Sequence, residues 1–154
     1  MSIALSLHVL FVSIWVGGMF FAYMILRPIA AQQLEPELRL NLWLRIFKRF
    51  FPWVWLAVII LPITGYIMIK IYGGMANIGL YIHIMHGLGW LMIFLFIYLF
   101  FIPFKQLEQS VINKNWPIAS THLNKMRIII GLNLGLGLLV VTIATLGRYY
   151  LKNP

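Results

Sequence analysis

The sequence contains no cysteine and no aspartate, and its only acidic residues are three glutamates. The absence of cysteine excludes disulfide bonds, thiolate metal sites, iron–sulfur clusters and thiol nucleophiles. The glutamates, Glu35, Glu37 and Glu108, all lie outside the long apolar runs of the chain. We therefore expect neither a hydrolytic zinc site nor a carboxylate proton relay within those runs.

Charged residues of both signs are also scarce, at 10% of the 154 residues, whereas hydrophobic residues make up 62%. The mean hydropathy is +0.93. A soluble domain carries about 25% charged and roughly 45–50% apolar residues. A water-soluble fold of this length could not bury so much apolar surface. The composition therefore predicts an integral membrane protein in contact with the lipid bilayer.

Four apolar stretches are long enough to cross a bilayer as helices, which takes about 20 residues. They cover residues 3–26, 52–72, 80–103 and 128–147. The connections between them are short enough to make consecutive helices antiparallel neighbours. We predict an all-α fold in which residues 1–154 form a single domain, an antiparallel four-helix transmembrane bundle.

Prolines mark several of the expected helix ends. The first span ends at Arg27-Pro28, the second begins at Pro52 and the third ends at Pro103, because proline suits a first helical turn and disrupts a helix interior. Two amphipathic segments, 38–51 and 104–111, lie between the spans. We predict that they form separate interfacial helices that lie along the lipid headgroups.

The basic residues are distributed unevenly between the two sides of this bundle. Nine of the twelve lie in the connections between the first and second spans and between the third and fourth. The positive-inside rule places these connections in the cytoplasm, so that both termini and the turn at residues 73–79 face the periplasm. Because topology and anionic headgroups explain the charge, we expect no nucleic-acid partner.

Three of the four histidines fall at a similar depth near the periplasmic side. His8 lies near the start of the first span, and His83 and His86 lie near the start of the third. His83 and His86 share a helix face because they are three residues apart. Ionisable side chains inside a membrane are costly and usually functional. We predict that these three histidines are metal or cofactor ligands, and we treat His122 as a loop residue.

One candidate cofactor is haem b, with iron held between His8 and either His83 or His86. Trp15 and Trp90 follow on the same helix faces, about one or two turns deeper, and would line the site. Such a protein would transfer electrons in the membrane, with a quinone or another redox partner. The sequence leaves open whether the protein is an enzyme, which in this case would be a haem-dependent membrane oxidoreductase.

Two basic residues at the same interface are candidates for binding the haem propionates. Lys70 closes the second span and Arg148 closes the fourth. Charge-assisted hydrogen bonds from these side chains would hold carboxylates firmly. Ordinary snorkelling of basic residues at a membrane surface explains the same two positions equally well.

Copper is the alternative ligand for the same histidines. Met85, and also Met68 and Met75, lie near the same end, and imidazole together with thioether suits Cu(I). A third possibility is a scaffold or partner subunit whose histidines are only interfacial. In that case the face of Gly131 and Gly135 would bind a second copy of the chain or another membrane protein.

Several elements of the sequence resemble, in order, the copper-resistance protein D (CopD) family, in its short stand-alone form. They are His8-Val-Leu-Phe-Val-Ser-Ile-Trp15-Val-Gly17-Gly18 with Arg27-Pro28, Arg49-Phe-Phe-Pro52-Trp53-Val-Trp55, Leu61-Pro-Ile-Thr-Gly65-Tyr66, Tyr81-Ile-His83, and Arg127-Ile-Ile-Ile-Gly-Leu-Asn133-Leu-Gly-Leu-Gly137 with Gly147-Arg148-Tyr149. The resemblance covers nearly the whole chain. It implies a multi-pass protein of the bacterial inner (cytoplasmic) membrane that serves copper resistance or copper import.

The first span also resembles, more distantly, the HemJ-type protoporphyrinogen oxidases, which are small four-helix membrane proteins that bind haem b. That family carries a histidine in the first helix and a His-x-Lys motif in the third. Here the third span reads His83-Ile-Met85-His86, so methionine stands at the lysine position. This resemblance implies the pairing of His8 with His83 or His86 as haem ligands but not the oxidase activity.

Overall fold

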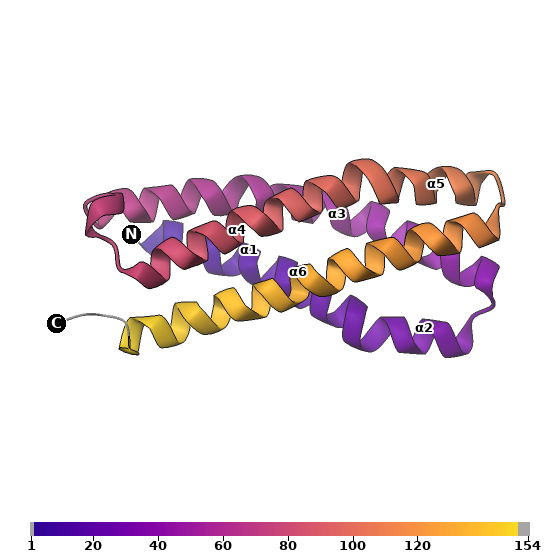
Figure 1. Ribbon diagram of the computed structural model, residues 1–154, viewed down its shortest axis with the longest axis horizontal. Helices are drawn as coiled ribbons and strands as arrows, with labels where there is room; N and C mark the ends of the chain where they lie inside the picture. The colour runs from indigo at the N-terminus through magenta and orange to yellow at the C-terminus, as the bar shows by residue number, and fades with distance from the viewer. Residues whose placement is uncertain (1, 151–154) are drawn as a thin grey trace.

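The computed structural model describes the backbone of residues 2–150 and the side chains of residues 3–147. This part of the chain forms four long helical rods that lie side by side, each antiparallel to the next (Figure 1). The rods comprise α1 (Ser2–Phe20), a π-helical turn (Phe21–Leu26) and α2 (Arg27–Gln33); α3 (Pro36–Ile71); α4 (Leu80–Leu99), a second π-helical turn (Phe100–Phe104) and α5 (Lys105–Ile112); and α6 (Trp116–Tyr150). The predicted all-α four-helix bundle is confirmed.

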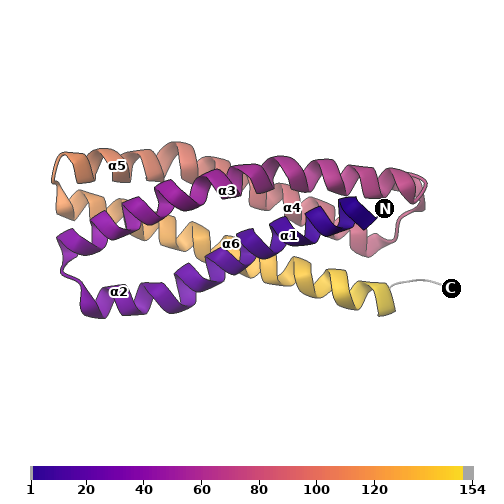
Figure 2. The ribbon, with the colours of Figure 1, turned by 180° about the vertical axis from the view of Figure 1, so that it is seen from behind.

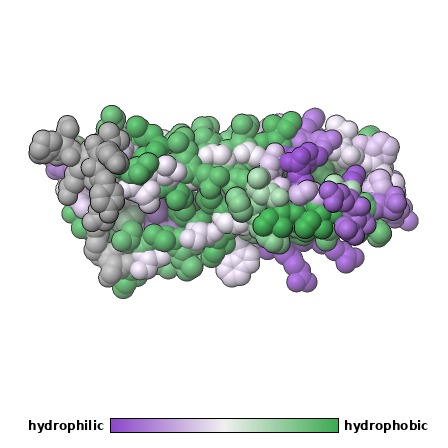
Figure 3. Space-filling model, turned by 90° about the horizontal axis from the view of Figure 1, so that it is seen from below, coloured by the Kyte–Doolittle hydropathy of each residue, from purple (hydrophilic) through white to green (hydrophobic). Residues whose placement is uncertain are grey.

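Each rod contains a helix that is long and apolar enough to cross a membrane. These four stretches are Ile3–Gln33, Pro36–Ile71, Leu80–Ile112 and Trp116–Gly147. In Figure 3 apolar side chains cover the body of the bundle and polar side chains gather at one end. The chain is therefore a multi-pass membrane protein.

The two ends of the bundle differ in what they contain. At one end α2 connects to α3 and α5 connects to α6, and the nine basic residues of these connections lie there; we call it the basic end. At the other end α1 begins, α6 ends, and α3 turns into α4 (Figures 1 and 2). That turn uses Gly73 and Gly74 at φ values of 93° and 94°, which only glycine adopts readily. This second end holds His8, His83 and His86, and we call it the histidine end.

The prediction that helices end at prolines is wrong at three positions. Pro28 stands in the first turn of α2, and the π-helical turn Phe21–Leu26 joins α2 to α1 without a break. Pro103 lies inside the second π-helical turn, and Pro52 lies inside α3. A π-helical turn adds one residue to the helix and gives the proline ring room. In a membrane bundle, neighbouring helices also compensate for the missing N–H.

The prediction of two separate interfacial helices is also wrong. Segment 38–51 is the beginning of α3, and its Leu40, Phe47 and Phe51 are buried in the bundle. Segment 104–111 continues the third rod into α5, which packs against α6 and buries Leu107 completely. The apolar faces of these segments pack against the other rods instead of against lipid. The bundle therefore extends beyond the apolar spans at the basic end.

An aromatic core joins the rods in the basic half of the bundle. Phe51 is in contact with Phe96 and Phe104, with ring centroids 5.5 and 4.8 Å apart in edge-on arrangements. Phe47 stacks on Phe51 at 5.2 Å, and Trp55 meets Phe96 edge-on at 5.2 Å. These rings join α3 to the third rod.

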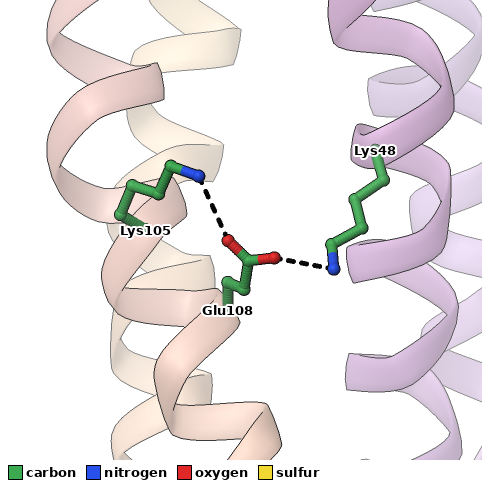
Figure 4. A network of polar contacts seen from close by, with 3 residues as sticks. All are labelled: Lys48, Lys105 and Glu108. Atoms are coloured by element: carbon green, nitrogen blue, oxygen red, sulfur yellow. Dashed lines mark hydrogen bonds and ion pairs between the residues drawn. The ribbon is translucent and has the colours of Figure 1, made fainter.

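An ion-pair network closes the core at the basic end (Figure 4). Glu108 of α5 binds Lys48 of α3 at 2.6 Å and Lys105 of its own helix at 3.3 Å. Among the side chains of residues 3–147, these two contacts are the ion pairs within 4 Å.

Small residues let α6 approach the other rods closely. A Cβ atom on Gly137 would lie 2.8 Å from Val16 Cγ2 of α1, and one on Gly131 would lie 3.0 Å from the Tyr23 ring. The amide of Asn133 donates a hydrogen bond to the Met92 carbonyl of α4 at 3.2 Å. Gly131 thus serves packing within the chain, whereas nothing lies within 4 Å of a Cβ built on Gly135.

Candidate functional site

A cavity of about 310 Å³ opens between α1, α3, α4 and α6 at the histidine end. Its wall is largely apolar and includes two of the predicted ligands, His8 from α1 and His86 from α4. Among the other lining residues are Val12, Trp15, Pro62, Gly65, Met68, Tyr72, Tyr81, Met85, Gly89, Trp90 and Met92. An apolar pocket with a few convergent polar groups is the usual form of a small-ligand site.

His8 is held in a defined orientation by Thr64 of α3. The His8 Nδ1 and Thr64 Oγ1 atoms are 2.8 Å apart. The Thr64 hydroxyl has one proton, and it donates this proton to the Ile60 carbonyl at 2.7 Å, with the Leu61 carbonyl at 3.1 Å. Thr64 Oγ1 must therefore accept the proton of His8 Nδ1. The neutral imidazole then carries an unprotonated Nε2, the form in which histidine binds a metal.

His86 is engaged differently. The Trp90 indole donates its N–H to His86 Nε2 at 3.1 Å, and the Tyr66 hydroxyl lies 3.1 Å from the same nitrogen. An indole N–H can only donate, so Nε2 of the neutral His86 ring is an acceptor and Nδ1 carries the proton. Neither ring nitrogen of His86 is free in this arrangement, in contrast to His8.

His83 lies outside the cavity wall. Its side chain is exposed on α4, one turn from His86. Within residues 3–147 the structure brings together no group of three or more His, Cys, Asp or Glu side chains that could hold a metal. His122 lies in the basic half of α6, where its Nδ1 is buried without a hydrogen-bond partner.

The two predicted tryptophans both line the cavity. Trp15 is buried at 3% exposure and meets the Phe96 ring edge-on at 6.2 Å, so it forms the boundary between the cavity and the aromatic core. Trp90 lies in the wall of α4 and fixes His86, as described above. Lys70 is exposed in the last turn of α3 and outside the lining. The side chain of Arg148 lies outside the described residues.

Sequence reasoning missed two residues of this site. Thr64 orients His8 and Tyr66 contacts His86. Met68, which the sequence placed near this end with Met85 and Met75, lines the cavity together with Met85. Thr64 is a polar residue in an apolar span, two residues after Pro62, and that placement was the available signal. The sequence suggested no common centre for Met85 and the histidines, but the fold brings Met85 to the same cavity as His8 and His86.

These features define a class of protein: a four-helix integral membrane bundle with a histidine- and methionine-lined cavity near one end. A family model described as Copper resistance protein D matches residues 44–146, which is more than half of the chain. The chain therefore belongs to the copper resistance protein D family. The matched region includes Thr64, His86 and Met85, whereas His8 lies before it. No curated protein and no solved structure matches the chain.

Proposed function

We propose that this protein binds Cu(I) in the cavity at the histidine end and serves copper handling in the membrane. The observation that carries the proposal is the hydrogen-bond chain from His8 Nδ1 to Thr64 to the Ile60 carbonyl at a cavity that His8 lines. Because the Thr64 proton goes to that carbonyl, we assign the Nδ1–H tautomer to His8, with Nε2 unprotonated. A hydrogen bond of this kind to the second ring nitrogen fixes the tautomer and the ring orientation of metal-binding histidines. The family description, Copper resistance protein D, agrees with this chemistry.

Thioether groups supply the other ligands. Met68 of α3 and Met85 of α4 line the same cavity as His8 of α1. Imidazole nitrogen and thioether sulfur are soft enough to favour Cu(I) over the hard cations. Because the ligands come from three different rods, bound copper would join α1, α3 and α4 at an end where the packing is open. His86 could add a ligand only by giving up its contacts with Trp90 and Tyr66.

Copper binding can be tested with purified protein titrated with Cu(I) under reducing conditions. We expect one strongly bound copper, lost in His8→Ala. Thr64→Val removes the acceptor for His8 Nδ1–H and should weaken binding by about 10–100-fold, whereas Thr64→Ser keeps the hydroxyl and should restore most of it. His122→Ala, at the other end of the bundle, is the matched control and should bind as the wild type does. Copper retention unchanged in both His8→Ala and Thr64→Val would refute the proposal.

The same titration separates the roles of the other two histidines. Because His83 is exposed and lies outside the cavity wall, His83→Ala should leave copper binding intact. His86→Ala should alter it only mildly, since His86 Nε2 is engaged by Trp90 and Tyr66 and Nδ1 carries the ring proton. A large loss with His83→Ala would return the ligand set to the three histidines that the sequence alone suggested.

Haem b is the second candidate for this cavity, supported by one observation. His8 and His86 come from two different helices and line one cavity, with Trp15 and Trp90 in its wall. Bound haem would supply electron transfer, with a quinone as a suitable membrane partner. Axial ligation by His86 requires the loss of its hydrogen bonds with Trp90 and Tyr66, which makes haem the poorer fit. Protein purified from haem-replete cells should then show a Soret band that weakens in His8→Ala; a colourless preparation would exclude haem.

The cell membrane and the orientation are part of the proposal. The protein lies in the bacterial inner membrane, with the basic end in the cytoplasm and the histidine end facing the periplasm, as the uneven basic charge favours. Because the chain has no cysteine, single cysteines can report on each side. A membrane-impermeant maleimide added to spheroplasts should label Ala76→Cys in the turn between α3 and α4 but not Asn113→Cys between α5 and α6. The reverse labelling pattern would invert the topology.

A further inference from the structure

Three arginines at the basic end differ from the other basic side chains there. Arg27 of α2, Arg39 of α3 and Arg127 of α6 are partly buried, whereas the remaining six basic residues of this end are exposed. Arginine is seldom buried without a partner for its guanidinium group. We call these three residues the arginine cluster.

Two members of the arginine cluster, Arg27 and Arg127, are brought together by Tyr23, and Arg39 of a third rod is within electrostatic range of Arg127. The charges of Arg27 and Arg39 both act on the guanidinium group of Arg127. The Arg27 guanidinium lies over the Tyr23 ring, 4.7 Å from its centroid. The same ring packs across Gly131, which is one turn from Arg127 on α6. Tyr23 therefore places Arg27 beside Arg127.

No carboxylate of the described residues forms an ion pair with this cluster, although Glu35 and Glu37 precede Arg39 in the chain. The ion pairs of the described side chains involve Glu108 with Lys48 and Lys105. The hydrogen bond that Arg127 makes, at 3.0 Å, goes to the uncharged side chain of Asn124. Three positive charges held together without a counter-charge repel one another, and an anion would relieve that repulsion. Phosphate suits this role because guanidinium groups bind it through paired hydrogen bonds.

An apolar cavity begins next to the arginine cluster. It has a volume of about 250 Å³ and is lined by α1 and the π-helical turn Phe21–Leu26 of the first rod, by α3, by the end of α4 and by α6. Leu26, which lines it, directly precedes Arg27, and Ile130, which also lines it, is three residues from Arg127. Ile46 and Phe50 of α3 complete that side of the wall. A ligand with an anionic head and an apolar tail would therefore meet complementary surfaces in the right order.

We propose that this end of the bundle is a binding site for an anionic diacyl phospholipid. The phosphate lies among Arg27, Arg39 and Arg127, and one acyl chain enters the apolar cavity beside Leu26 and Ile130. Basic pockets between transmembrane helices are a recognised form of lipid site. Here the three rods that carry the arginines also line the apolar cavity, together with Phe96 and Leu99 of α4. The proposal is independent of the copper site, which lies at the other end.

The first test compares lipids by their effect on thermal stability of the protein in a neutral detergent. Dioleoyl phosphatidylglycerol should raise the Tm by about 5 °C, a shift typical of a ligand well above its dissociation constant in a chain of this size. Dioleoyl phosphatidylcholine and free glycerol phosphate should have little effect. An equal shift with phosphatidylcholine, or with glycerol phosphate, would overturn the proposal. Dihexanoyl phosphatidylglycerol should shift the Tm less than the dioleoyl lipid. An equal shift would contradict the proposal that an acyl chain occupies the apolar cavity.

The second test asks whether the cluster itself is responsible. Arg27→Gln, Arg39→Gln and Arg127→Gln should each lose most of the phosphatidylglycerol shift, measured against that variant's own Tm without lipid. Arg45→Gln and Arg49→Gln remove the same charge from exposed positions of α3 and should keep it. An equal loss in these controls would indicate diffuse attraction and overturn a specific site. If a glutamine variant fails to fold, the lysine variant of that residue, which keeps the charge but not the paired hydrogen bonds, should still lose part of the shift.

Discussion

The basic half and the histidine half of this bundle use the same four rods in opposite ways. In the basic half, Phe47, Phe51, Phe96 and Phe104 form a continuous aromatic core. In the histidine half, the rods enclose a cavity of about 310 Å³. Lipid tails are as apolar as the side chains, so burial from water does not hold such helices together, and close packing must do so. The aromatic core of the basic half therefore fixes the rods, although a smaller cavity of about 250 Å³ borders it, whereas the histidine half encloses the larger cavity and is less tightly joined.

The largest difference between the halves should appear when core side chains are shortened. Phe51→Ala removes a ring that is 4% exposed and contacts Phe47, Phe96 and Phe104, and such changes cost about 3–5 kcal/mol. Met85 lines the larger cavity, is only partly buried and makes none of these ring contacts, so Met85→Ala should cost much less. Unfolding in mixed micelles of increasing sodium dodecyl sulfate would measure both free energies. Equal losses would mean that the histidine half is packed as tightly as the basic half.

Two glycines of α6 allow close packing and open space to be compared on a single helix. A Cβ on Gly137 would lie 2.8 Å from Val16 Cγ2 and 3.2 Å from Met92 Cε, whereas Gly135 faces open space. Gly137→Ala should therefore destabilise the bundle, by about 1–3 kcal/mol, because α6 must move away from α1 and α4. Gly135→Ala should be neutral or slightly stabilising, since alanine favours the helix. The same unfolding assay applies, and destabilisation by both would show that Gly135 packs against something outside the chain.

The general fold was predictable from the sequence because apolar length alone determines how many helices can cross a bilayer. The helix ends at Pro28 and Pro103 were not, because the π-helical turns that accommodate them depend on packing between rods. Nor could the sequence show that segment 38–51 joins α3, since an amphipathic face reads the same whether it meets lipid headgroups or protein.

The candidate site was predictable only in outline. The equal depth of His8 and His86 indicated a shared site, and both line the cavity. Spacing alone did not separate His83 from His86, because residues three apart differ by about 60° around a helix and the rotation of α4 is set by its neighbours. Thr64 is 56 residues from His8 in the chain, so no local pattern could reveal that it orients the imidazole. That contact determines which nitrogen is free, and it emerges only when α1 packs on α3.

The smallest effect is expected at the ion pairs that close the basic end. Glu108→Gln removes the charge that joins α5 to Lys48 of α3 at 2.6 Å, but both partners are partly exposed, and such pairs contribute about 0.2–1 kcal/mol. The loss should shrink as salt is raised, because salt screens exposed charges. Glu37→Gln, an exposed glutamate near the start of α3, is the matched control and should change the free energy of unfolding less. A loss as large as that of Phe51→Ala would mean that charge, and not the aromatic core, holds the basic half together.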